Sequence, residues 1–135
     1  MTTWQKENST DKAIKIVLFL ISPFLSLLYS LKRMNTRSSY VVFFLFAVFF
    51  GMAFTVPNVR DKINSLDGVS YRIQFEEYAF KTSYDYFEGL KEFLTLDKGK
   101  KDYYFDTVAY YVSRITDNYH MMFMVFATIF AFFML

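Results

Sequence analysis

Asp67 and Arg72 lie five residues apart in the stretch LDGVSYRIQFEEY, on either side of Tyr71. A spacing of five is poor for a pair on one helix face, but it suits two side chains that meet across a turn. Such a pair could handle a charged substrate, with the carboxylate as general base or as the group that orients the arginine. The alternatives are a surface salt bridge of little energetic value and a simple Asp-Gly turn.

Three more residues have side chains that could take part in chemistry. Arg114 precedes an apolar segment and has Asp117 three residues later, so it could serve a site or anchor a helix end. Asp102 follows two lysines, which favours a solvated turn. His120 could titrate near neutral pH, although a histidine at a helix start with an ordinary hydrogen bond is the preferred interpretation. One histidine and no cysteine predict neither a metal site nor a cofactor.

The elements that must position these residues are unusually apolar. Hydrophobic residues make up 54% of the 135 residues, including 18 Phe and 11 Tyr, and they are concentrated in blocks. Soluble proteins spread a smaller apolar fraction through amphipathic patterns. The net charge of +2, without one long basic tract, argues against a nucleic-acid partner. The composition therefore predicts an all-α integral membrane protein.

The apolar blocks predict two full transmembrane helices and a third, incomplete one, because a span needs roughly 20 apolar residues. Lys15 is expected to snorkel from the first span and Pro23 to kink it. The predicted order is a polar leader at 1–12, spans at 13–31 and 40–56 joined by a basic turn at 32–39, an outer segment at 57–119, and the incomplete span at 120–135.

The basic turn KRMNTRSS predicts the orientation, because short loops rich in lysine and arginine stay in the cytoplasm. The N-terminus and residues 57–119 are then expected outside. Apolar residues at helical spacing predict two amphipathic outer helices, roughly 71–96 and 102–116. A short strand within 69–75 is an alternative to the start of the first. The last span ends without a polar tail, which predicts the front portion of a longer polypeptide.

Several short motifs resemble the EpsG-like family of bacterial membrane proteins, which is related to Wzy-type O-antigen polymerases. The resemblance runs from about residue 13 to the end of the chain, and it corresponds to the N-terminal portion of family members. Its motifs are Gly51 with Pro57-Asn58, Asp67 with Ser70-Tyr71-Arg72 and Phe75, Asp102 with Tyr104, and Val112-Ser113-Arg114-Ile115-Thr116 with Asn118.

The resemblance implies a role in exopolysaccharide, capsule or O-antigen synthesis at the bacterial plasma membrane. The implied chemistry is polymerisation or transfer of sugars carried on a polyprenyl diphosphate. Arg72, Arg114 and Tyr71 would contact the diphosphate or the sugar, because guanidinium forks bind such oxygens bidentately, and Asp67 would act as base or orienter. The implied partners are the lipid bilayer, the lipid-linked glycan and other polysaccharide-assembly membrane proteins.

Two hypotheses about the chain as a whole stay open on the sequence. In the first, it is the front part of a glycosyltransferase or polymerase and is inactive alone, since further catalytic groups would lie downstream. In the second, it is a complete small membrane protein that acts as a non-catalytic anchor or interaction partner.

Overall fold

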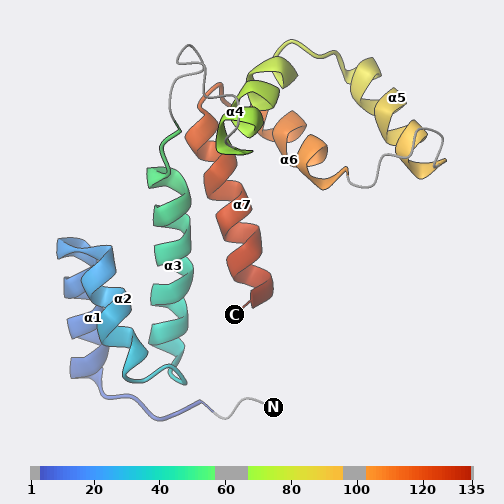
Figure 1. Cartoon of the computed structure of the whole chain (residues 1–135). Coiled ribbons are helices and arrows are strands. Elements are labelled where there is room, and N and C mark those ends of the chain that lie inside the picture. The colour runs from blue at the N-terminus through green and yellow to red at the C-terminus, as the bar shows by residue number, and fades with distance from the viewer. Residues whose placement is uncertain (1–3, 57–66, 96–102, 135) are drawn as a thin grey trace. The chain divides into compact units, whose positions relative to one another are not determined.

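The computed structural model describes residues 4–56, 67–95 and 103–134, and within these ranges all regular structure is α-helical. The chain divides into two compact units, unit 1 (Met1–Ala53 with Met124–Leu135) and unit 2 (Phe54–Phe123). The helices, coloured along the chain in Figure 1, are α1 (Ser9–Ile21), α2 (Pro23–Leu31), α3 (Arg37–Ala53), α4 (Asp67–Tyr78), α5 (Ser83–Leu94), α6 (Tyr104–Ser113) and α7 (Tyr119–Met134).

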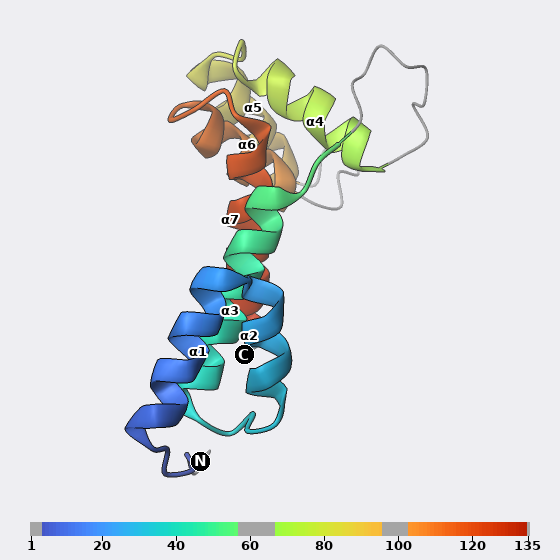
Figure 2. The ribbon, with the colours of Figure 1, turned by 90° about the vertical axis from the view of Figure 1, so that its left-hand side faces the viewer.

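Unit 1 begins with a helical hairpin in place of the predicted span at 13–31. The helix ends at Ile21, because Ser22 has an extended backbone (φ −158°, ψ 113°) and Pro23 then starts α2 as its first residue. Proline suits that position, since it has no N–H and its φ is already helical. The chain therefore folds back, and α1 and α2 lie side by side in both views (Figures 1 and 2).

α3 packs against both helices of the hairpin and runs in the same direction as α1. It has 17 residues and α7 has 16. At 1.5 Å per residue, their lengths of about 24–26 Å fall short of the roughly 30 Å hydrocarbon core of a bilayer. Across the described ranges, none of the helices combines the length and apolarity that a membrane crossing requires.

That finding corrects three connected predictions. The fold class of two full transmembrane helices plus a truncated third is wrong, although its all-helical part is confirmed. The designation as a transmembrane protein is wrong with it. The predicted placement as a multi-pass protein of the bacterial plasma membrane, with the N-terminus and residues 57–119 outside, is overturned for the same reason. The physical causes are the break at Ser22 and the shortness of α3 and α7.

Unit 2 contains α4, α5, α6 and the first turn of α7, and α4 packs against α6. The predicted helix at 71–96 is two helices, since Thr82 starts α5 with a capping box in which its side chain and that of Asp85 exchange hydrogen bonds with backbone N–H groups. The core is rich in tyrosine. The Tyr86 ring stacks on Tyr110 with centroids 4.1 Å apart, and both side chains are buried.

Candidate ligand-binding groove in unit 1

A buried lysine ties the hairpin to α3 and to the segment before α1. Lys15 is 1% exposed, and its ammonium donates hydrogen bonds to Glu7 (2.5 Å), Thr36 (3.0 Å) and Ser38 (2.8 Å). All three of its protons are thus used. The prediction that Lys15 snorkels to a membrane surface is therefore wrong: the side chain turns inward toward Glu7, before α1, and toward Thr36 and Ser38, at the start of α3.

Asp11 completes this network on the side of α2. Its carboxylate lies 3.3 Å from the Lys15 ammonium and accepts a hydrogen bond of 2.8 Å from the Tyr29 hydroxyl. The Tyr29 hydrogen bond, together with the nearby Lys15 ammonium, lowers the pKa of Asp11 below its ordinary value of 3.8, against the opposing effect of burial. The same bond raises the pKa of Tyr29. Ser26 adds a further link by donating to the Lys15 carbonyl at 2.8 Å.

This network predicts an acid-sensitive unit 1. Because the pKa of Asp11 is lowered in the fold, its carboxylate contributes stability above the ordinary pKa of 3.8, and that stability is lost as the pH falls through the lower, folded-state pKa. We expect Asp11→Asn to flatten the fall of unfolding free energy below pH 4. Urea unfolding of both proteins at a series of pH values measures this; parallel curves would show that Asp11 does not contribute.

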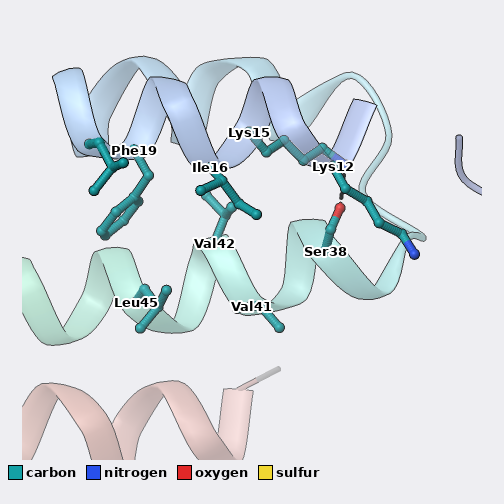
Figure 3. Close-up of a pocket in the computed structure, with 9 residues that line it drawn as sticks. Lys12, Lys15, Ile16, Phe19, Ser38, Val41, Val42 and Leu45 are labelled. Carbon is teal, nitrogen blue, oxygen red and sulfur yellow. Dashed lines mark hydrogen bonds between the residues drawn. The ribbon is translucent and has the colours of Figure 1, made fainter. Parts of the chain in front are cut away.

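An apolar groove runs along the face between α1 and α3. Its volume is about 390 Å³. The walls are aliphatic and aromatic, and Ile16 and Leu20 on them are 61% and 80% exposed. The lining residues are Lys12, Lys15, Ile16, Phe19 and Leu20 from α1 and Ser38, Val41, Val42 and Leu45 from α3. Side chains of both helices point into the space between them (Figure 3).

One end of the groove is polar. Ser38 and Lys15 meet there, and the Lys12 ammonium extends beyond them, away from the apolar side chains (Figure 3). In the part of the chain that the structure describes, no hydrogen bond or ion pair holds that ammonium. The groove thus has apolar walls and, at one end, the Lys12 ammonium, which no described residue binds. It could receive a ligand that has an apolar body and an anionic end.

The polar end belongs to a strongly basic region of unit 1, where α1 begins, α2 ends and α3 begins. Residues 4–53 carry six basic side chains and two acidic ones, both of which lie against Lys15. The excess positive charge comes from Lys6, Lys12, Lys32 and Arg37. All four are exposed and have no ion-pair partner among the described residues. A negative charge would therefore be attracted to this end of the unit.

The residues predicted as a site from the sequence lie in unit 2. Arg72, in α4, makes an ion pair of 2.9 Å with Glu76, and its guanidinium lies 4.5 Å from the centre of the Tyr119 ring. Tyr71, its neighbour, packs its ring against Phe105 of α6 with centroids 4.9 Å apart. Asp67 is exposed in the first turn of α4, in helix rather than in the turn that the sequence suggested.

Arg114 is the C-terminal cap of α6 and holds the end of α4. Its guanidinium donates to the carbonyls of Tyr78 (3.2 Å) and Lys81 and lies 4.8 Å from the centre of the Tyr110 ring. Arg72 and Arg114 thus contact different sets of residues. Both are engaged in holding unit 2 together, and the structure does not bring them to a shared pocket in the described ranges.

Two buried tyrosines of unit 2 have raised pKa values. Tyr78 donates a hydrogen bond to Asp106, and burial together with that bond raises the pKa of Tyr78, so its hydroxyl stays protonated. Burial raises the pKa of Tyr103 to about 12. Among the described residues, no three histidine or acidic side chains gather in a way that could hold a metal ion. Asp102 lies outside the described residues.

Sequence reasoning missed the groove residues because it assigned residues 13–31 to a single span. A usable signal was present: Lys12, Ile16, Phe19 and Leu20 follow a helical i, i+4, i+7, i+8 spacing that begins with a lysine. Comparisons with protein-family models, with curated proteins and with solved structures found no match.

Proposed function

We propose that unit 1 binds an amphiphile with a hydrocarbon chain and an anionic end. In the setting that the sequence resemblance implies, this ligand is a polyprenyl-diphosphate-linked sugar of polysaccharide synthesis. One observation carries the proposal: an apolar groove of about 390 Å³ that ends at the Lys12 ammonium, which no described residue binds. Sites for small ligands are typically about 300–1,000 Å³, mainly apolar, with a few polar groups that fix orientation.

The separation of apolar side chains along the groove from cations at its end supports a ligand of this kind. The hydrocarbon chain would lie against Ile16, Phe19 and Leu45, and the phosphate groups would lie near Lys12 and the other exposed cations at that end. Lys15 would act indirectly, because its protons are already bound and its role is to hold Ser38 and α1 in place. The residues predicted for sugar transfer lie in unit 2, so the groove accounts for binding the lipid and not for the transfer.

Titration of the protein with farnesyl diphosphate, a water-soluble prenyl diphosphate, tests the proposal by calorimetry. We expect saturable binding that weakens with salt, and Lys12→Gln should lower the affinity by about two- to fivefold, as for an exposed charge pair. Ile16→Trp should abolish binding by filling the groove at a side chain that is already exposed. Lys91→Gln, in α5 of unit 2, is the matched control and should bind normally.

Two results would contradict the proposal. One is the absence of saturable binding by the unaltered protein. The other is undiminished binding by Ile16→Trp with an unchanged melting temperature, which would place the ligand elsewhere.

A further inference from the structure

A second apolar groove lies on the other side of the same α3 residues. It has a volume of about 340 Å³. Its lining residues are Tyr40, Val41, Phe44 and Leu45 from α3 and Ala131 and Phe132 from α7, all within unit 1. Val41 and Leu45 line this groove as well as the first one, so the two grooves are neighbours along α3.

Val41 and Leu45 form a ridge between the two grooves. They are one helical turn apart and are 57% and 42% exposed. In Figure 3 both side chains point from α3 toward the side on which the C-terminal part of α7 runs, whereas Val42 points toward α1. Both grooves also reach the N-terminal end of α3, one at Ser38 and the other at Tyr40.

We propose that the two grooves together bind a lipid with two hydrocarbon chains joined at one phosphate-bearing head, of the diacylglycerol phosphate class. One chain lies in each groove, and the ridge of Val41 and Leu45 separates them. This inference rests on the proposed function: it keeps an anionic amphiphile in the first groove and adds a second hydrocarbon chain, so such a lipid would compete there with a single-chain prenyl diphosphate. The head lies at the N-terminal end of α3, where exposed cations outnumber acids and complement its negative charge.

The arrangement of the grooves favours two chains over a single longer one. Both grooves are lined by Val41 and Leu45, and both include a residue near the start of α3, so one head at that end can supply a chain to each groove. A single chain that used both grooves would have to leave the first and cross the exposed ridge at Val41 or Leu45.

Dihexanoyl phosphatidic acid is a suitable two-chain probe, because its short chains keep it dissolved as single molecules. Lauroyl lysophosphatidic acid provides the same number of chain carbons in one chain, and glycerol 3-phosphate provides the head alone. We expect the two-chain probe to bind at least about tenfold more tightly than the one-chain probe, since burial of even two further methylene groups gives that ratio. Glycerol 3-phosphate should bind most weakly.

One substitution on each wall of the second groove tests whether the second hydrocarbon chain binds there. Ala131→Phe fills it from α7, and Phe44→Trp narrows it from α3. Each should remove the two-chain advantage while leaving the affinity for the one-chain probe and for farnesyl diphosphate unchanged. Because Ala131 is buried, the melting temperature of each variant is measured alongside, and Phe44→Trp decides the result if Ala131→Phe does not fold.

The outcomes separate this inference from the function on which it rests. Equal affinity for the one-chain and two-chain probes, or a two-chain advantage that survives both variants, would overturn the second chain site while farnesyl diphosphate still binds. If neither lipid nor farnesyl diphosphate binds, the proposed function itself fails. Binding of glycerol 3-phosphate as tight as that of the lipids would reduce the site to one for phosphate alone.

Discussion

Replacement of Lys15 with alanine is expected to lower the free energy of unfolding of unit 1 by about 3–5 kcal/mol. The ammonium is 1% exposed and lies 2.5 Å from Glu7 and 3.3 Å from Asp11, whose side chains are 4% and 12% exposed. Without the lysine, two carboxylates would stay in poorly hydrated surroundings without their main cation. Thr36 and Ser38 would each lose a hydrogen bond as well.

Urea unfolding followed by circular dichroism measures this effect. Lys12→Ala is the matched control, since it removes an exposed lysine of the same helix and should change stability by no more than about 0.5 kcal/mol. Adding Glu7→Gln to Lys15→Ala should recover part of the loss, because it removes one of the two uncompensated charges. A loss no greater than that of Lys12→Ala would show that the Lys15 network does not hold the hairpin.

Replacement of Gly89 with alanine is expected to destabilise unit 2, against the usual preference of helices for alanine. A Cβ at position 89 would lie 2.6 Å from the Tyr103 hydroxyl oxygen, which is too close for any real contact. That hydroxyl is buried and donates to the Tyr86 carbonyl at 2.8 Å, so it cannot move away freely. An overpacking cost of about 1–3 kcal/mol then outweighs the gain of about 1 kcal/mol in helix propensity.

Tyr103→Phe should reverse the sign of this effect. Once the hydroxyl is gone, the nearest ring atom lies 3.5 Å from the new Cβ, an ordinary contact, so Gly89→Ala should be neutral or stabilising in the Tyr103→Phe background. Gly68→Ala is the control, because its Cβ would meet only Val56 and Phe54 at 3.5 Å or more. Thermal unfolding of the unaltered protein, the two single variants and the double variant gives the coupling energy between positions 89 and 103. A cost of Gly89→Ala that persists without the hydroxyl would contradict the explanation.

Much of the helical structure could be predicted from the sequence, because apolar blocks and helical spacing are local signals. The blocks at 40–56 and 120–135 correspond to α3 (Arg37–Ala53) and α7 (Tyr119–Met134). The preference for helix over strand at 69–75 agrees with α4. The break at Ser22 was missed because a proline within an apolar run is compatible with either a kinked helix or the start of a new one.

The other wrong predictions concern long-range contacts. Lys15 looked like a residue at a membrane surface because its partners Glu7, Thr36 and Ser38 lie 8 to 23 residues away in sequence. The helical spacing of apolar residues over 71–96 indicated a helix but not its buried face: Tyr84 and Phe87 are exposed, and Tyr86 between them is buried. Arg114 and the Tyr119 contact of Arg72 involve backbone carbonyls and rings far along the chain, which no spacing reveals, whereas the Arg72–Glu76 ion pair is an i,i+4 contact that the spacing allows.

The hairpin at Ser22 brings the chain back so that α3 lies beside α1 and the groove can form, and it removes the first predicted span. The sequence contains no cysteine, so Lys12→Cys and Lys32→Cys can carry a pair of spin labels at two exposed positions. We expect a short distance between the two labels, because Asp11 and Tyr29, close to these positions, share a hydrogen bond. A distance near 30 Å, the rise of 20 residues in one continuous helix, would contradict the hairpin.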